Sequence, residues 1–191
     1  MRVITGSAKG KPLKTLDGRD TRPSAASTKE TMFSAVQFDV EGAIVLDLFA
    51  GSGQLGIEAL SRGAAFVYFA DSNPRAVAVI KENLASLGKS GMLGKTTHHD
   101  CKHYRVDRLA YHVCLKLIKN EIDIAFLDPP YERDILEKVL PMLIPKMSEE
   151  GIIVCEHEKR LCLPKSIDTF KVDKIYNKST QNITVYRRVQ R

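Results

Sequence analysis

Apolar positions alternate along the chain between short buried runs and longer segments with helical spacing. The run 122–128 (IDIAFLD) is apolar over the length of a strand, whereas 73–88 (NPRAVAVIKENLASLG) shows helical periodicity after an early proline. Strands that alternate with helices in this way predict a mainly parallel sheet covered by helices on both faces. The predicted strands are 43–50, 65–71, 92–100, 122–128 and 151–158, and the predicted helices are 54–63, 73–88, 103–119 and 133–145, the last broken near Pro141.

The two ends of the chain depart from this pattern. Residues 1–24 are rich in Gly, Lys, Thr and Pro and predict an irregular β-hairpin, and a helix is expected over 24–37. Residues 170–190 (FKVDKIYNKSTQNITVYRRVQ) contain two alternating segments around a polar turn, which predicts a terminal antiparallel hairpin. We therefore expect a seven-stranded α/β domain over 41–191, preceded by an extension over 1–40.

Composition places the chain among ordinary soluble globular proteins, with 43% hydrophobic and 27% charged residues in 191. No apolar run reaches the length of a membrane span, and the first residues lack the apolar stretch of a signal peptide, so we expect a cytoplasmic protein without a membrane partner. We also expect a monomer. The four cysteines show no CxxC spacing and are expected as free thiols, namely Cys101, Cys114, Cys155 and Cys162.

Positive charge is concentrated at the N-terminus. Residues 1–29 hold seven basic side chains against two acidic ones, whereas the whole chain has a formal net charge of +6. Such a basic stretch is typical of a contact with a nucleic-acid phosphate backbone, although a solubilising arm has the same composition. The candidates for phosphate contacts are Lys9, Lys11, Lys14, Arg19, Arg22 and Lys29.

A glycine-rich loop follows the first predicted strand. Residues 46–56 (LDLFAGSGQLG) contain G-x-G-x-x-G, a motif that is weak alone but lies here between a strand and a helix. Asp71 ends the next strand, where its carboxylate can accept hydrogen bonds from ribose hydroxyls. A nicotinamide cofactor and S-adenosyl-L-methionine both fit these features.

Asp47 favours S-adenosyl-L-methionine, because a carboxylate so close to the loop repels a pyrophosphate but attracts an ammonium or sulfonium group. The alternative is an Asp47 that only organises the loop. In the third predicted strand, Asp100 and Cys101 are expected near the adenine ring. The histidines around them do not predict a metal site, because neighbouring residues on a strand point to opposite faces.

The segment 126–131 (FLDPPY) ends a buried strand abruptly, since Pro129 and Pro130 cannot continue the ladder. The turn holds Asp128 and Tyr131 rigidly on either side. An exocyclic amine of a nucleobase is a poor nucleophile, and acceptors on its N–H groups stabilise the charge that develops as it attacks a methyl sulfonium. The Asp128 carboxylate and the Pro129 carbonyl are such acceptors, and Tyr131 offers a face for stacking a base. A strand-ending turn without function is the alternative.

Four stretches of the sequence, taken together, resemble known protein families. DLFAGSG and FLDPPY together resemble the class I S-adenosylmethionine-dependent amino-methyltransferases, which have a Rossmann-like fold. The N-terminal RVITGSAKGKPL and TRPSAASTKETMF resemble the bacterial family that methylates a guanine N2 of 16S ribosomal RNA, over nearly the whole chain. Where that family has R-P-T-T-D-R, this chain reads RPSAAS at 22–27, which changes the expected contacts at that helix start.

The resemblance implies a methyl donor, S-adenosyl-L-methionine, and a partner, 16S rRNA in the small ribosomal subunit or its assembly intermediate. It implies catalytic positions at Asp128, Pro129, Pro130 and Tyr131. The implied cofactor positions are Arg22, Asp47, Phe49, Ala50, Gly51, Ser52, Gly53, Asp71, Ser72, Asn73, Asp100 and Cys101.

Three alternatives stay open at this point. The same chemistry can act on an adenine N6 or a small-molecule amine, since DPPY does not distinguish them, although the basic N-terminus disfavours a small molecule. A non-catalytic RNA-binding assembly factor is disfavoured by intact Asp47, Asp71 and Asp128. A nicotinamide oxidoreductase is disfavoured by Asp47 and has no evident use for Pro-Pro-Tyr.

Overall fold

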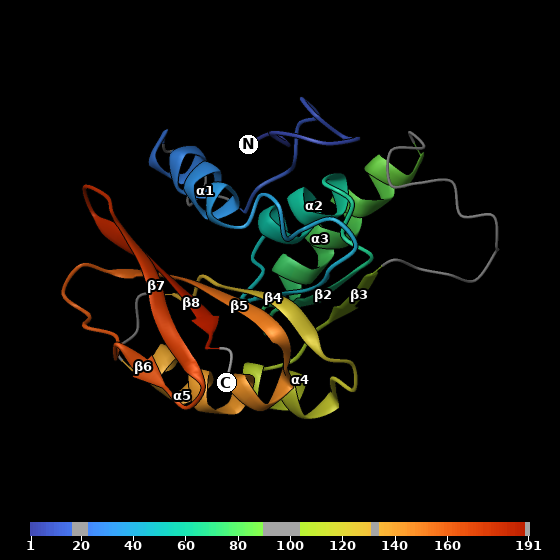
Figure 1. Ribbon diagram of the computed structural model, residues 1–191. Coiled ribbons are helices and arrows are strands. Elements are labelled where there is room, and N and C mark those ends of the chain that lie inside the picture. Colours follow the sequence, from blue (N-terminus) through green and yellow to red (C-terminus); the bar gives the residue numbers. More distant parts are fainter. Residues whose placement is uncertain (17–22, 90–103, 131–133, 190–191) are drawn as a thin grey trace.

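A central twisted sheet organises the molecule, seen in a computed structural model that describes residues 1–16, 23–89, 104–130 and 134–189 (Figure 1). The eight strands have the order β3-β2-β1-β4-β5-β8-β7-β6. The pairs from β3 to β5 are parallel, and those from β5 to β6 are antiparallel. The strands are β1 (Ile44–Leu48), β2 (Phe66–Ala70), β3 (Tyr104–Asp107), β4 (Ile122–Leu127), β5 (Met147–Glu158), β6 (Ser166–Ile167), β7 (Phe170–Asn177) and β8 (Gln181–Arg188).

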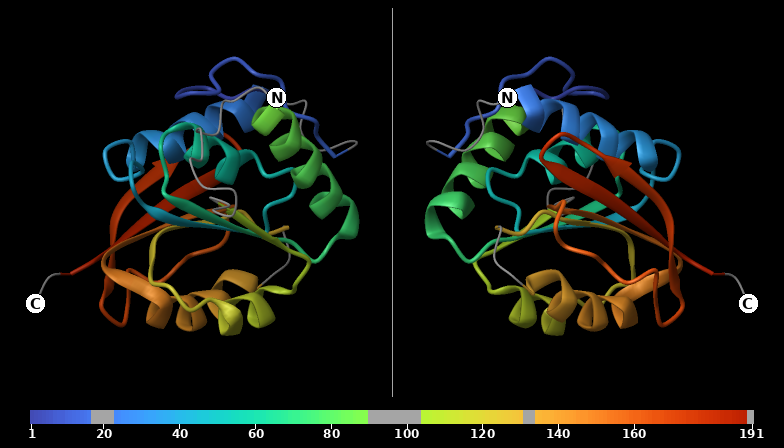
Figure 2. Two further views of the ribbon diagram at one scale, coloured as in Figure 1. Left: turned by 90° about the vertical axis from the view of Figure 1, so that its right-hand side faces the viewer. Right: turned by 90° about the vertical axis from the view of Figure 1, so that its left-hand side faces the viewer.

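Helices cover both faces of the sheet, as Figure 2 shows from two sides. One face packs against the N-terminal segment, α1, α2 and α3 in a cluster that includes Val3, Phe33 and Ile80. The other face packs against α4, α5 and the short 3-10 turn η1. The N-terminal segment thus shares its core with the sheet. The helices are α1 (Pro23–Ala35), α2 (Gln54–Ser61), α3 (Pro74–Lys89), α4 (Tyr111–Leu117), α5 (Ile135–Leu143) and η1 (Ile144–Lys146).

Two sequence expectations were wrong in the described residues. The helix expected over 103–119 is the strand β3 at its start, and α4 begins at Tyr111. Tyr104 packs edge-on against Phe69 of β2, with ring centroids 6.4 Å apart. β3 is only four residues long, so its alternation of inward and outward side chains is too short to be recognised in the sequence. The helix expected to break near Pro141 continues to Leu143. The strand expected over 92–100 lies outside the described residues.

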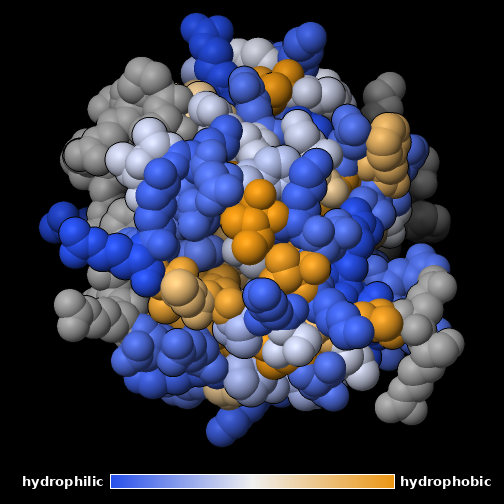
Figure 3. Space-filling model, turned by 60° about the vertical axis from the view of Figure 1, so that its left-hand side comes forward, coloured by the Kyte–Doolittle hydropathy of each residue, from blue (hydrophilic) through white to orange (hydrophobic). Residues whose placement is uncertain are grey.

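The C-terminal end of the chain follows the sequence expectation. The terminal hairpin is confirmed as β7 and β8, which pair from Phe170–Arg188 to Asn177–Asn182. Six of the seven expected strands are present as β1, β2, β4, β5, β7 and β8, and the sheet also contains β3 and β6, a two-residue edge strand that pairs with the start of β7. On the face of the molecule shown in Figure 3, a few hydrophobic side chains gather within a largely hydrophilic surface.

The predicted N-terminal hairpin is confirmed for residues 1–13. Val3 N donates to Lys11 O at 3.0 Å, and Gly10 N donates to Val3 O at 2.9 Å. Its turn lies against the end of α2, where Gly6 has a φ of 86° and an added Cβ would meet the Ser61 carbonyl oxygen at 1.7 Å. A side chain at Gly6 would therefore push the hairpin off the helix.

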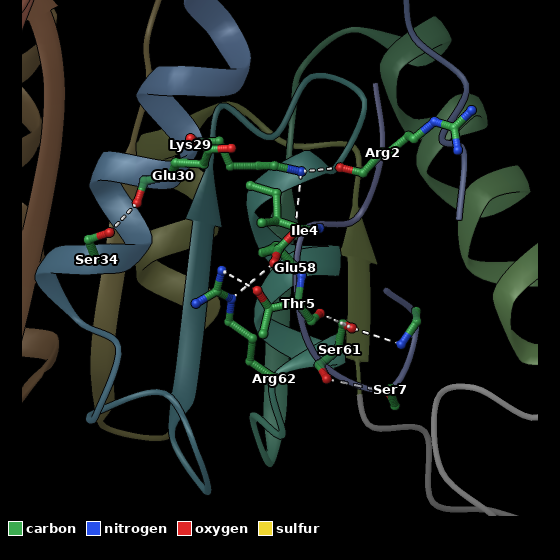
Figure 4. A network of polar contacts seen from close by, with 11 residues as sticks. Arg2, Ile4, Thr5, Ser7, Lys29, Glu30, Ser34, Glu58, Ser61 and Arg62 are labelled. Atoms are coloured by element: carbon green, nitrogen blue, oxygen red, sulfur yellow. Dashed lines mark hydrogen bonds and ion pairs between the residues drawn. The ribbon is translucent and has the colours of Figure 1, made fainter. Parts of the chain in front are cut away.

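A buried carboxylate joins this hairpin to both neighbouring helices (Figure 4). Glu58 of α2 has no exposed surface and accepts hydrogen bonds from Ile4 N at 2.7 Å and Thr5 N at 2.9 Å. Its oxygens also lie 3.2 Å from Lys29 Nζ and 3.0 Å from Arg62 Nε. One carboxylate thereby binds backbone donors of the hairpin, the Lys29 cation of α1 and the Arg62 cation just after α2.

This network corrects one expectation about RNA. Lys29 was predicted to contact phosphate, but its side chain is only 3% exposed and its Nζ donates to Arg2 O at 2.7 Å. Burial lowers the pKa of Lys29, and the ion pair with Glu58 opposes that shift. Lys29 therefore serves to hold α1 on the hairpin.

We expect Glu58→Ala to lower the free energy of unfolding by roughly 3–5 kcal/mol, because Lys29 loses its buried partner. Urea unfolding followed by circular dichroism measures this. The matched control is Glu82→Ala, which removes the partner of Lys14 in an exposed ion pair of 2.7 Å. That control should cost less than about 1 kcal/mol. Equal, small losses in both variants would contradict a stabilising role for the Glu58 network.

Candidate functional site

A cavity of about 1370 Å³ opens at the C-terminal ends of β1, β2, β4 and β5. In open sheets with parallel strands, ligands bind at this edge, next to the point where the strand order reverses. Here the order reverses between β1 and β4. The expected cofactor positions that line the cavity are Asp47, Phe49, Ala50, Gly51, Ser52, Asp71, Ser72 and Asn73, and Asp128, Pro129 and Pro130 line it as well.

The glycine loop between β1 and α2 has the backbone geometry that its sequence predicts. Phe49, Gly51 and Gly53 all have positive φ, of 71°, 53° and 78°. Phe49 N and Ala50 N each donate to Ala70 O at 3.0 Å, which fixes the loop on the end of β2. A non-glycine residue with positive φ is uncommon, and such strain concentrates at ligand-binding sites.

Asp47, in β1, holds the residues that follow the glycine loop through a hydrogen bond. Its side chain is 2% exposed, and its Oδ2 accepts a hydrogen bond of 2.8 Å from Gly56 N in the first turn of α2. Burial raises the pKa of Asp47 to about 7, and the nearby Asp128 and Asp71 raise it further while the Gly56 N–H opposes them. A cation bound above the loop would favour the ionised form of Asp47. The two sequence interpretations of Asp47 are thus compatible.

Asp71 ties the loop to the end of β2. Its Oδ2 accepts from Gly51 N at 2.9 Å, and its Oδ1 accepts from Asn73 N at 2.8 Å. Each oxygen keeps a further lone pair, so the carboxylate can still accept hydroxyl hydrogens on its cavity side. The backbone of Asp71 also donates to Asp107 O of β3 at 3.2 Å.

The opposite wall of the cavity begins where β4 ends. Asp128 is exposed, and Pro129 after it is buried, so the turn presents a carboxylate from a fixed backbone. Asp128 lies close enough to Glu156 at the end of β5 to help burial raise the pKa of Glu156 to about 8. Carboxylates from separate strands therefore converge on one cavity, and their mutual repulsion favours ligands that carry positive charge or hydrogen-bond donors.

Several expected positions lie outside the described residues, namely Arg19, Arg22, Asp100, Cys101 and Tyr131. In the described residues, β3 ends at Asp107, seven residues after Asp100. Of the basic candidates, Lys9 and Lys14 are exposed, and Lys14 also pairs with Glu82 at 2.7 Å. The turn that carries Lys9 packs on Ser61, at the end of α2 away from the glycine loop.

Other residues at the cavity were missed in the sequence. Glu156 follows the apolar run of β5 as Asp128 follows that of β4, and this shared position is a signal that could have found it. Lys159 and Arg160 are exposed at the rim and add positive charge next to the cavity. Gln181 of β8 donates to Thr28 Oγ1 of α1 at 2.8 Å and closes the wall between them.

Neither a membrane span nor a metal centre is found in the described part of the chain. No described helix is long and apolar enough to cross a membrane. Among the described residues, no group of three or more His, Cys, Asp or Glu side chains is placed to hold a metal ion. The histidines at 98, 99 and 103 fall in the part that is not described.

Comparison with known proteins gives matches over nearly the full length. The family model described as "Conserved hypothetical protein 95" matches residues 1–187. A protein of Bacillus subtilis (strain 168) named "Putative rRNA methyltransferase YlbH" is 36% identical over 191 residues, which cover 98% of this chain and 99% of that protein. "Ribosomal RNA small subunit methyltransferase D" of Escherichia coli (strain K12) is 30% identical over 166 residues, which cover 86% of this chain and 78% of that protein.

A solved structure agrees with these matches. "Putative methyltransferase yhhF from Escherichia coli" superposes with a TM-score of 0.84 and 27% identity, covering 100% of this chain and 99% of that one. The predicted fold class, a Rossmann-like class I methyltransferase domain with a C-terminal antiparallel hairpin, is confirmed.

Proposed function

We propose that this chain, which belongs to the family described as Conserved hypothetical protein 95, methylates the exocyclic N2 amine of a guanine in 16S ribosomal RNA. S-adenosyl-L-methionine is the proposed methyl donor. The observation that carries the proposal is the shared cavity: the glycine loop above Asp47 and the rigid Asp128–Pro129 turn face the same space. Relatives named as ribosomal RNA methyltransferases support RNA as the substrate class.

The residues at the C-terminal ends of β1 and β2 fit the proposed cofactor. Asp47 and Asp71 supply negative charge for an ammonium group and acceptors for ribose hydroxyls, and the positive-φ loop lets the backbone approach closely. When bound, S-adenosyl-L-methionine supplies an electrophilic methyl group on a sulfonium. Asp71 keeps the loop in place through Gly51 N, so the site is formed before any ligand arrives.

The end of β4 acts on the base. The Asp128 carboxylate and the Pro129 carbonyl accept the two hydrogens of the exocyclic amine, which orients its lone pair and stabilises the positive charge that develops on nitrogen. A proline follows each of Asp128 and Pro129 in the chain, so no N–H from the next residue competes for the acceptors. Positioning of this kind accounts for a large part of the rate in such transfers.

RNA is held by charge outside the cavity. We propose that Lys9 and Lys11 of the N-terminal hairpin contact phosphates, together with Lys159 and Arg160 at the rim. Phosphate contacts position the strand, while the target base is taken out of its stack into the cavity.

Methylation of an adenine N6 is the second candidate, because the Asp128 turn offers the same acceptors to either amine. Mass mapping of methylated nucleosides in 16S rRNA from a strain without this gene decides between them. Loss of one N2-methylguanosine supports the proposal, and loss of an N6-methyladenosine replaces it.

Calorimetry should detect binding of S-adenosyl-L-methionine and none of NAD. Ionised Asp47 is the form that attracts the ammonium group, and its pKa is raised to about 7, so affinity should rise between pH 6 and pH 8. Asp47→Asn keeps an acceptor for Gly56 N but loses the charge, and it should bind more weakly with a flatter pH dependence. Tight NAD binding without a response to S-adenosyl-L-methionine would falsify the cofactor assignment.

Asp128→Ala should slow methyl transfer by on the order of 10²-fold or more, because one transition-state acceptor is lost. Single-turnover kinetics measures the transfer, and equilibrium titration should show nearly unchanged cofactor affinity. Asp173→Ala is the matched control, since that carboxylate is 52% exposed on β7, outside the cavity lining. Near-normal transfer in Asp128→Ala would remove Asp128 from the catalytic role.

Lys9→Gln with Lys11→Gln should weaken RNA binding and flatten its salt dependence. Each phosphate contact contributes a slope of about −0.7 in log affinity against log salt on single strands, so two lost contacts remove about 1.4. Fluorescence anisotropy with labelled RNA at several salt concentrations measures the slope. Lys116→Gln with Lys119→Gln removes the same charge from exposed positions at the end of α4, on the other face of the sheet. Equal slopes in the two double variants would mean that the hairpin does not bind RNA.

A further inference from the structure

Glu156 is a half-buried carboxylate in the cavity that the proposed chemistry does not yet use. It follows Cys155, which pairs in register with Leu127, the residue before Asp128. The two carboxylates therefore leave adjacent parallel strands at the same level, and such strands lie about 4.8 Å apart. The backbone of Glu156 pairs with Ile183 of β8, whereas no donor among the described residues makes a hydrogen bond to its carboxylate.

The strand order separates Glu156 from the cofactor loop. β5 lies beyond β4 as seen from β1, so Asp128 stands between Glu156 and the loop of Asp47 and Gly51. The cavity lining on β5 and β8, which pair with each other, and just beyond them also includes Glu158, Lys159, Arg160, Thr180 and Gln181. Glu156 is thus on the side of the cavity to which the proposed function assigns the target base.

We propose that Glu156 determines base specificity by accepting the N1–H of the target guanine. This inference rests on the proposed function and identifies which edge of the base the cavity recognises. Guanine carries N1–H beside the exocyclic N2 amine, so its edge presents neighbouring donors. Asp128 and Glu156 present neighbouring acceptors at a matching level. Adenine has an acceptor lone pair at N1, which an ionised carboxylate repels.

The electrostatic environment of Glu156 increases the expected preference for guanine over adenine. Burial and the charge of Asp128 raise the pKa of Glu156 to about 8, so ionisation is costly without a donor facing it. The guanine N1–H is such a donor and favours the carboxylate form. A site that leaves a buried polar group unpaired with the wrong ligand discriminates more strongly than one that merely lacks an apolar contact.

The test uses a base that keeps the reacting amine and changes only the edge. 2-Aminopurine has the exocyclic amine at C2 but an unprotonated N1. The probe is 16S rRNA in which the methylated guanine, located by mass mapping, is replaced by 2-aminopurine through splinted ligation. The measured quantity is the ratio of kcat/KM for guanine RNA to kcat/KM for 2-aminopurine RNA.

Wild-type protein should prefer guanine strongly, and Glu156→Gln should reduce that preference at least tenfold, because the amide can donate to an unprotonated N1. The missing O6 of 2-aminopurine affects both proteins alike and cancels in the comparison. A structural role would lower both rates together and leave the ratio unchanged. Wild-type preference should also grow as the pH rises through about 8, because the ionised carboxylate is the form that rejects the unprotonated N1.

The possible failures are distinguishable. Normal methylation of guanine by wild type with an unchanged ratio in Glu156→Gln overturns this inference alone. Absence of methylated guanine with wild type overturns the proposed function and this inference with it. Cofactor affinity measured on both proteins should be equal, and a large loss in Glu156→Gln would assign Glu156 to the cofactor instead.

Discussion

The buried carboxylate of Glu58 is the interaction on which the arrangement of the N-terminal third depends. A carboxylate without exposed surface must be satisfied by donors, and here they come from Ile4 N, Thr5 N, Lys29 and Arg62. Glu58 sits in α2, the helix that the glycine loop begins. Glu58 therefore fixes the N-terminal hairpin to α2, the helix that follows the glycine loop of the proposed cofactor site. A basic segment attached in this way can orient RNA relative to the loop, whereas a free arm cannot.

A second constraint is the gathering of acidic groups at one edge of the sheet. Asp47, Asp71, Asp128 and Glu156 lie at or near the C-terminal ends of separate strands and line one cavity. Burial and the neighbouring carboxylates disfavour ionisation, and they raise the pKa of Asp47 to about 7 and that of Glu156 to about 8. A cationic methyl donor and a base edge with several N–H groups both relieve it. The electrostatics of the cavity thus favour the two proposed ligands for the same physical reason.

The sequence was sufficient to predict the elements and site residues whose geometry depends only on the local residue type. Buried apolar runs identified β1, β2, β4 and β5, and the acids that end them identified most of the cavity. It was insufficient where the outcome depends on a distant partner. Lys29 is buried because it pairs with Glu58, which is distant in the sequence, and no residue near Lys29 in the chain indicates this burial. β3 is four residues long, with Arg105 and Asp107 paired at 2.7 Å on it, and so short a segment has no readable period. Glu156 was overlooked because the acids and histidine of CEHE were taken only as the end of a strand.

The topology explains how one edge of a sheet can serve two ligands. The strand order reverses between β1 and β4, so loops leaving these strands diverge and open a space between them. Residues on the β1 and β2 side are occupied with backbone donors of the glycine loop, through Gly51 and Gly56. On the other side, Asp128 follows β4 directly into a rigid turn, and Glu156 stands beside it on β5. Methyl donor and methyl acceptor are thereby assigned to opposite sides of the reversal point, and the transfer proposed here crosses it. If the proposed roles hold, a change of base specificity requires changes at the ends of β4 and β5, while the cofactor side stays as it is.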